Sequence, residues 1–222
     1  MQDTPLPAVV IEPTGAHRAT IIWLHGLGAD GHDFQSIAGE LQLPEALGVR
    51  FILPHAPHRP VTLNGGYVMR AWYDIASADI NRTPDEEGIQ ASRQAVEQLI
   101  DREIAQGIKP ERIILAGFSQ GGVIALETAT HQQNKVGGVI ALSCYTAFPQ
   151  RIPPARRSLP IFMGHGAQDA IVPLALGLAA RNELESRGYA VEWRDYPMPH
   201  SVCWEEIADI RRWLLERLQD QS

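Results

Sequence analysis

Ser119 lies in the pattern Gly117-Phe118-Ser119-Gln120-Gly121, with a glycine two positions before it and two after it. An apolar run, residues 112–116, precedes this pattern, and a helix-like stretch, residues 122–127, follows it. A strand, a sharp turn and a helix in that order are typical of a nucleophile elbow, which lifts a serine hydroxyl above a sheet. The glycines let the strand and helix backbones approach closely. The pattern therefore predicts that Ser119 is a nucleophile.

His200 is the histidine that fits as the base for this nucleophile. A serine hydroxyl attacks only when a base takes its proton and a carboxylate orients that base. In hydrolases with such an elbow, the order along the chain is serine, acid, histidine. Five of the eight histidines precede Ser119, His131 falls on the helix after it, and His165 precedes the best acid. His200 remains, in a loop before the last expected helix, and we expect it to be the general base.

Asp169 is the expected acid of this set. It lies in a loop that follows the apolar run 159–164, whereas the other acidic residues between Ser119 and His200 fall on expected helices or within a strand. A loop after a strand is where such hydrolases carry this carboxylate. Asp195 is the alternative, although an acid in mid-strand is more often solvated or salt-bridged. We therefore favour Asp169 over Asp195.

An oxyanion that forms during attack needs two backbone N–H donors. One is normally the N–H of the residue after the nucleophile, which here is Gln120, and the other comes from the loop after an early strand. In this chain an apolar run, residues 20–24, leads into His25-Gly26-Leu27-Gly28. We expect Leu27 to be the second donor and its side chain to face the acyl group.

Two other kinds of site compete for the segment 26–58 and are not favoured. Residues 26–31 match Gly-x-Gly-x-x-Gly after a strand, but a dinucleotide site also needs an acid at the end of the second strand, and none stands there. His55 and His58 could ligate a metal, but Pro57 prevents a helix that presents both rings, and no carboxylate is close in sequence. We expect neither a metal nor an organic cofactor.

Strands and helices alternate along the chain, which predicts an α/β fold with a mostly parallel sheet covered by helices on both faces. In such sheets sites form at the carboxyl ends of the strands, where each candidate residue falls. Helices are clearest at 85–106, with Thr83 as cap, Pro84 at the first position and Glu86 completing a capping box, and at 204–218. The expected strands are 19–25, 49–53, 112–118, 136–143, 159–164 and 190–195.

Composition limits the class of protein. With 222 residues, 45% of them hydrophobic, the chain is long enough for one buried core, and we expect a single domain over residues 1–222. A net charge of −7 without a basic stripe argues against nucleic-acid binding. The first 14 residues lack Lys and Arg and are not expected to be a signal peptide, and no stretch is long enough to cross a bilayer. The two cysteines are expected to be free buried thiols, which fits a cytoplasmic protein.

Several further motifs make the chain similar to the phospholipase/carboxylesterase family of α/β-hydrolases, which includes acyl-protein thioesterases and small bacterial carboxylesterases. The resemblance implies an α/β-hydrolase fold without a large cap domain, a metal or an organic cofactor. It implies hydrolysis of carboxylic esters or thioesters whose acyl chains are short to medium in length. It also implies lysophospholipids and acylated proteins as further substrates. The motifs are Leu24-His25-Gly26-Leu27-Gly28, Pro54-His55-Ala56-Pro57, residues 59–64, Ala71-Trp72-Tyr73-Asp74-Ile75, residues 114–122, residues 141–144, and Asp169 with Val172-Pro173-Leu174.

Two departures from the family pattern affect the expected acyl site. Ala170 replaces the proline that commonly follows the acid, and Tyr145 stands where some thioesterases have tryptophan. We expect the acyl group to lie against four apolar residues near the strand ends. These are Leu27, Trp72, Tyr145 and Ile171.

The connection 55–82 is long and rich in Pro and Gly. It is either a surface linker or a segment whose residues 76–80 form an apolar flap over the site, and the sequence does not distinguish the two.

The main expectation is a serine carboxylesterase that forms an acyl-enzyme on Ser119, with acyl-protein thioesterase or lysophospholipase activity as the alternative. A non-catalytic binding module remains a second class, because a fold does not determine a function. A peptidase or transacylase would use the same site. Self-association into a homodimer also stays open.

Overall fold

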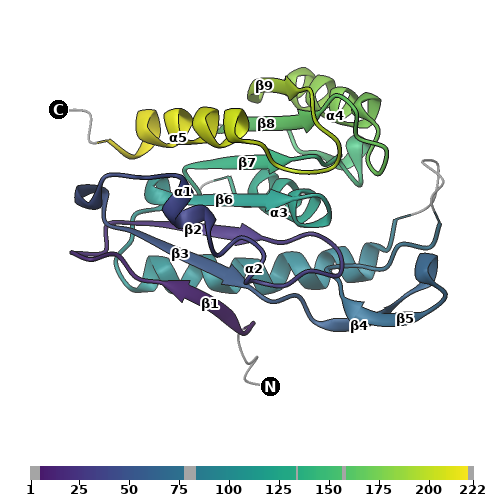
Figure 1. The fold of residues 1–222 in the computed structure, drawn as a ribbon, viewed down its shortest axis with the longest axis horizontal. Coiled ribbons are helices and arrows are strands. Elements are labelled where there is room, and N and C mark those ends of the chain that lie inside the picture. The colour runs from purple at the N-terminus through teal and green to yellow at the C-terminus, as the bar shows by residue number, and fades with distance from the viewer. Residues whose placement is uncertain (1–5, 78–83, 134, 157–158, 220–222) are drawn as a thin grey trace.

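The computed structural model describes residues 6–77, 84–133, 135–156 and 159–219. Seven strands form one sheet in the order β1-β3-β2-β6-β7-β8-β9, as Figure 1 shows. Neighbouring strands run parallel except β1, which pairs antiparallel with β3 at one edge. The strands are β1 Ala8–Ile11, β2 Ala19–Leu24, β3 Val49–Pro54, β6 Ile113–Phe118, β7 Gly138–Leu142, β8 Pro160–Gly166 and β9 Ala190–Tyr196.

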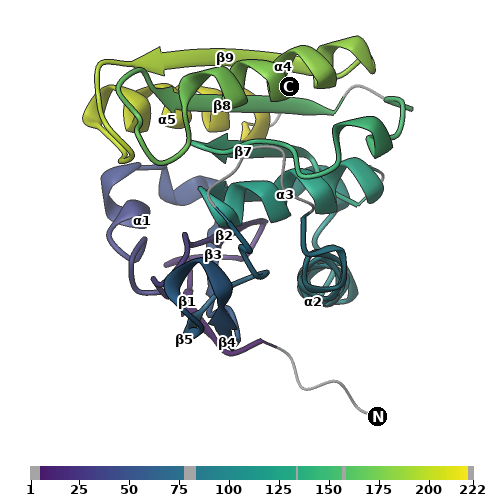
Figure 2. The same ribbon diagram turned by 90° about the vertical axis from the view of Figure 1, so that its right-hand side faces the viewer.

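Among the described residues, five α-helices cover the two faces of this sheet. Helices α2, α3 and α4 lie on one face, and α1 and α5 lie on the other (Figure 2). The helices are α1 Ile37–Glu40, α2 Glu86–Ala105, α3 Gln120–His131, α4 Leu174–Ser186 and α5 Trp204–Leu218. The expected α/β-hydrolase architecture with a mostly parallel sheet is therefore confirmed.

The central strands are buried on both sides because their alternating side chains enter two separate cores. In β2, Ile21 and Trp23 pack with α1 and α5, whereas Ile22 and Leu24 pack with α2 and α3. Strands buried on both faces read as continuous apolar runs, which is why their positions were readable from the sequence. The six expected strands agree with the observed strands to within two residues at each end.

The start of α2 differs from the expected capping box. Asp85 is the N-cap, and its carboxylate accepts a hydrogen bond from the backbone N–H of Gly88 at 2.9 Å. An aspartate at this position satisfies one of the orphan N–H groups of the first turn, so the helix begins at Glu86. The expectation of a cap at Thr83 is wrong at this point, and Thr83 itself lies outside the described residues.

The connection 55–82 contains a β-hairpin that its weak periodicity did not reveal. Strands β4, His58–Val61, and β5, Tyr67–Arg70, pair antiparallel as a separate two-stranded sheet, joined by a 3-10 turn at Thr62–Asn64. The side chains of Tyr67 and Val68 are exposed, so the hairpin lacks the alternation that marks a half-buried strand. Part of the expected flap, residues 78–80, lies outside the described residues.

Within the part of the chain that the structure describes, no helix is both long enough and apolar enough to span a membrane.

Candidate active site

Ser119 occupies the sharp turn between β6 and α3. Its backbone has φ 54° and ψ −119°, a conformation that residues other than glycine rarely adopt. The turn is held by a hydrogen bond from the Ser119 N–H to the Leu142 carbonyl at 2.8 Å. A strained residue held by its surroundings at the head of a helix is what a nucleophile elbow requires.

The glycines of the elbow are needed because backbone fills the space where a Cβ would lie. A Cβ on Gly117 would lie 2.4 Å from the backbone of Gly121, and a Cβ on Gly121 would lie 2.3 Å from the carbonyl oxygen of Leu24. Both distances are far below van der Waals contact. The expected close approach of strand and helix is confirmed, and it brings the end of β2 against the start of α3.

The loops after β8 and β9 bring Asp169 and His200 together. The Nδ1–H of His200 donates to Oδ2 of Asp169 at 2.6 Å. Oδ1 of Asp169 accepts hydrogen bonds from the backbone N–H groups of Ile171 and Val172, at 2.9 and 2.8 Å. These bonds anchor the carboxylate although Ala170 stands in place of the family's proline. The structure thus pairs the expected base with the expected acid.

The alternative acid, Asp195, lies elsewhere. Its side chain is exposed, and it accepts a hydrogen bond from the indole N–H of Trp193 at 3.2 Å. Asp169, by contrast, has a fully buried carboxylate. Burial strengthens the electrostatic interaction of a carboxylate with its partner, so Asp169 is the carboxylate able to orient the base.

His200 lies beside the nucleophile. Its ring packs against the ring of Phe118, the residue before Ser119, with the centroids 4.7 Å apart. Both Ser119 and His200 line one cavity of about 1350 Å³. The carboxyl ends of β6, β8 and β9 therefore deliver a serine, an acid and a histidine to the same place, as expected for a parallel sheet.

The cavity is wide and mostly apolar. Three of the four expected acyl contacts, Leu27, Tyr145 and Ile171, are among its lining residues. The side chain of Ile171 is 71% exposed, which places it at the rim. The sequence did not predict several other apolar lining residues, namely Leu63, Ile75, Ala147, Phe148 and Leu176. Two of these, Leu63 and Ile75, stand in motifs that the family resemblance had marked.

Trp72 does not line this cavity, so the expectation that it contacts the acyl group is wrong. Its side chain is 0% exposed, and its indole N–H donates to the backbone carbonyl of His25 at 2.9 Å. Its ring also packs against the ring of His25, with the centroids 5.3 Å apart. Trp72 therefore stabilises the loop after β2 from its buried side, because the buried carbonyl of His25 needs a hydrogen-bond donor.

His25 holds the same loop from inside. Its Nδ1–H donates to the Gly26 carbonyl at 2.7 Å, while Nε2 accepts from the N–H of Ala56 at 3.0 Å. These bonds require a neutral ring, and burial lowers the pKa of His25 to about 4. At neutral pH the ring is therefore uncharged, and it links the loop after β2 to the end of β3.

Gln120 is tied to the segment that carries Trp72. Its side-chain oxygen accepts from the backbone N–H of Trp72 at 2.8 Å, and its amide nitrogen donates to the Tyr73 carbonyl at 2.7 Å. Leu27 and Gln120 both line the cavity with Ser119. Trp72 thus bonds both to Gln120 and to the His25 carbonyl, and so links the segments of the two expected oxyanion donors.

The cysteines do not supply a competing nucleophile. Cys144 is buried, and its Cβ lies 2.8 Å from where a Cβ on Gly122 would be, beneath α3. Burial raises the pKa of Cys144 and, at a half-buried position, that of Cys203. A protonated thiol is a poor nucleophile, and neither cysteine is among the residues that line the cavity.

The likeness to known proteins extends over nearly the whole chain. A family model described as Phospholipase/Carboxylesterase matches residues 6–217. A protein of Neurospora crassa named acyl-protein thioesterase 1 is 39% identical, over 96% of this chain and 92% of that protein. The crystal structure of Zea mays acyl-protein thioesterase 2 is 30% identical with a TM-score of 0.84, over 96% of this chain and 99% of that one. Arabidopsis thaliana SOBER1 is 32% identical with a TM-score of 0.84, over 91% and 100%.

Proposed function

The chain belongs to the phospholipase/carboxylesterase family, whose members hydrolyse esters and thioesters, and we propose that it is a serine hydrolase that forms an acyl-enzyme on Ser119. The observation that carries this proposal is the 2.6 Å contact between the buried Asp169 and His200, which lines the same cavity as Ser119. A serine nucleophile requires a nearby base, and that base requires an acid that orients it. This site contains a strained serine, a histidine and an acid that orients the histidine.

In the proposed first step, His200 takes the proton of the Ser119 hydroxyl as its oxygen attacks the acyl carbonyl carbon. Because Nδ1 of His200 donates to Asp169, the unprotonated nitrogen is Nε2, and the imidazolium that forms is stabilised by the carboxylate. The N–H groups of Leu27 and Gln120 hold the oxyanion. His200 then gives its proton to the leaving alcohol or thiol, and the acyl group stays on Ser119.

In the second step, water attacks the acyl-enzyme. His200 takes a proton from this water, the same two N–H groups hold the second oxyanion, and Ser119 leaves with the proton returned from His200. The step releases the free acid and restores the starting site. No metal or organic cofactor takes part in this scheme.

The proposed substrates are acyl esters and thioesters, including acyl groups carried by proteins. The cavity volume of about 1350 Å³ exceeds that of most small-molecule pockets and suits an acyl chain. The relatives named acyl-protein thioesterase support thioesters as a substrate class. The two unpaired cysteines support the cytoplasm as the place of this reaction.

The proposal is tested by labelling with a fluorophosphonate probe and by hydrolysis of p-nitrophenyl esters. We expect Ser119→Ala to lose both labelling and turnover, because removal of the nucleophile removes covalent catalysis. Ser36→Ala is the control, since Ser36 is exposed and its side chain makes no cap hydrogen bond. Labelling of Ser119→Ala at the wild-type level would contradict the assignment, and wild-type protein without any turnover would favour the binding module.

Substrate class is tested by measuring kcat/KM for esters, thioesters and lysophospholipids that share one acyl chain. A thioester preference would support action on acylated proteins. A preference for lysophospholipid would replace that part of the proposal and leave the role of Ser119 intact.

A further inference from the structure

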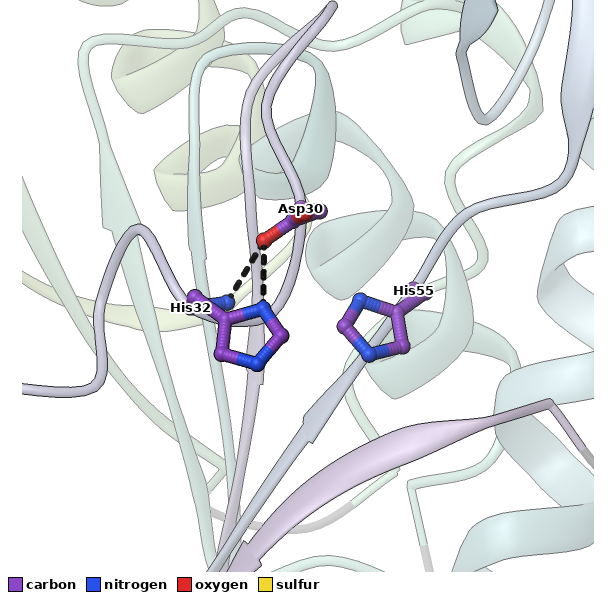
Figure 3. Close-up of side chains that lie close together, drawn as sticks. All are labelled: Asp30, His32 and His55. Carbon is purple, nitrogen blue, oxygen red and sulfur yellow. Dashed lines mark hydrogen bonds and ion pairs between the residues drawn. The ribbon is translucent and has the colours of Figure 1, made fainter.

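Asp30, His32 and His55 form a second cluster of reactive side chains, apart from the serine, acid and histidine of the cavity. Asp30 and His32 lie on the loop after β2, and His55 follows directly after β3. One potential ligand atom from each of the three side chains lies within 4.8 Å of the other two. Figure 3 shows the two imidazole rings facing each other beneath the Asp30 carboxylate.

Hydrogen bonds already orient these three groups. Oδ1 of Asp30 accepts from the backbone N–H of His32 at 2.8 Å and from its ring Nδ1 at 3.0 Å. Nδ1 of His55 accepts from the backbone N–H of Gly31 at 2.9 Å, so this nitrogen carries a lone pair. The ring centroids of His32 and His55 are 5.3 Å apart. Two imidazoles and one carboxylate therefore converge in orientations that hydrogen bonds hold.

We propose that Asp30, His32 and His55 bind a divalent transition metal ion of the zinc class. Zinc takes imidazole nitrogen and carboxylate oxygen at about 2.0–2.2 Å, with water able to fill a fourth position. Magnesium and calcium prefer oxygen ligands, so a site with two nitrogens selects against them. The contact of 3.0 Å between Asp30 and His32 already matches two neighbouring ligands of one ion.

An ion at this site would act on the loop that carries Leu27. It would compete with the Gly31 N–H for the lone pair on His55 and would tie the loop after β2 to the end of β3. The loop already lies close against the end of β3 at this point, because a Cβ on Gly31 would lie 2.1 Å from the Leu53 carbonyl oxygen. If Leu27 donates to the oxyanion, as proposed above, an occupied site reorganises this loop and slows turnover.

Binding is tested by calorimetric titration of the metal-free protein with Zn²⁺, without substrate. We expect one saturable site whose affinity falls by at least about tenfold in His32→Ala and in Asp30→Asn, since even partners outside the ligand set can cost that much. His58→Ala is the matched control, because His58 is an exposed histidine three residues after His55. Melting temperatures of the metal-free variants check that they fold.

The site is ruled out if wild-type protein shows no saturable Zn²⁺ binding, or if His32→Ala and Asp30→Asn bind as tightly as wild type. Binding that persists unchanged at pH 5 would also overturn it, because protonated imidazoles cannot ligate a metal. Mg²⁺ at the same concentration is expected to give no comparable signal.

The effect on the loop is tested by ester hydrolysis with and without Zn²⁺. We expect slower turnover in wild type and in His58→Ala, and no change in His32→Ala. Equal inhibition of His32→Ala would show that Zn²⁺ acts elsewhere and would overturn the link to the loop, as would undisturbed turnover of zinc-bound wild type. Absence of turnover in the metal-free enzyme would instead contradict the proposed function, while the binding result would stand.

Discussion

Asp169 shows how a loop prepares a single carboxylate for its role. One of its oxygens is held by two backbone N–H groups, and the other faces His200. The side chain therefore cannot rotate away, and the imidazole that it orients keeps one tautomer. Chain order and loop position were enough to predict that Asp169 pairs with His200, because the motif requires both.

We expect Asp169→Asn to lower kcat by about 10⁴, since the amide no longer favours the tautomer that leaves Nε2 free. Asp195→Asn is the control, and its kcat should stay within a few-fold of wild type because its side chain is exposed away from the cavity. The measurement is steady-state hydrolysis of a p-nitrophenyl ester. A larger loss in Asp195→Asn than in Asp169→Asn would reverse the assignment of the acid.

Trp72 and Ile171 should affect the reaction in different ways. Trp72→Phe removes the donor to the His25 carbonyl, so we expect a lower kcat with an unchanged preference among acyl chain lengths. Ile171→Ala removes a side chain from the cavity rim, so we expect a changed preference with a smaller effect on kcat. The measurement is kcat/KM over a series of p-nitrophenyl esters. A shifted preference in Trp72→Phe would return Trp72 to the acyl site.

The elbow depends on the fit between β2, β6 and α3 rather than on any one side chain. Its glycines stand where three backbones meet, and a methyl group there has no room to be accommodated. The sequence pattern predicted this contact because glycine spacing within an elbow is local. It did not predict the hairpin of β4 and β5, whose strands pair with each other and leave large side chains exposed.

We expect Gly121→Ala to destabilise the protein by about 1–3 kcal/mol or more, because the added Cβ would lie 2.3 Å from a rigid carbonyl oxygen. Gly39→Ala in α1 is the matched control: nothing lies within 4 Å of its Cβ, and alanine favours a helix by about 0.5–1 kcal/mol. Urea unfolding measures both free energies. Equal stability of the two variants would show that the elbow can relax.

Several acidic side chains are buried in the part of the chain that the structure describes, and Glu206 is one of them. Glu206, at the start of α5, is 0% exposed, and neither of its oxygens has a hydrogen-bond partner among the described residues. Burial, with a smaller contribution from Asp209, raises its pKa to about 8. An uncharged acid is compatible with this site, whereas an ionised one is not.

This burial makes stability depend on pH. In the unfolded chain the carboxyl ionises near pH 4.5, and in the folded chain near pH 8, so the folded state holds the extra proton between these values. The contribution of Glu206 to the stability of wild type should therefore fall as the pH rises from about 5 to 8. The glutamine of Glu206→Gln cannot ionise. We therefore expect the free energy of unfolding of this variant to increase relative to that of wild type as the pH rises over this range.

Urea midpoints at pH 5 and pH 8 test this expectation, with Glu205→Gln as the control because Glu205 is exposed on the same helix. Burial also raises the pKa of Glu127, to about 7, but this group is present in all three proteins and cancels in the comparison. A constant difference between Glu206→Gln and wild type across the range would show that Glu206 is ionised in the folded protein.

The amino-acid sequence by itself predicted the α/β-hydrolase class and the family, and it selected Ser119, Asp169 and His200 as the proposed reacting set. These follow from local patterns: apolar periodicity, the spacing of glycines in a turn, and the order of residues at strand ends. Each depends on neighbours a few positions away, so it can be read along the chain.

Only the tertiary structure decided which way side chains face and which distant segments meet. It turned Trp72 under the loop after β2 instead of into the cavity, and it brought His55 to Asp30 and His32. Both outcomes depend on the packing of segments more than twenty residues apart along the chain. The residue spacing within each segment does not predict that packing, because the packing depends on the whole core.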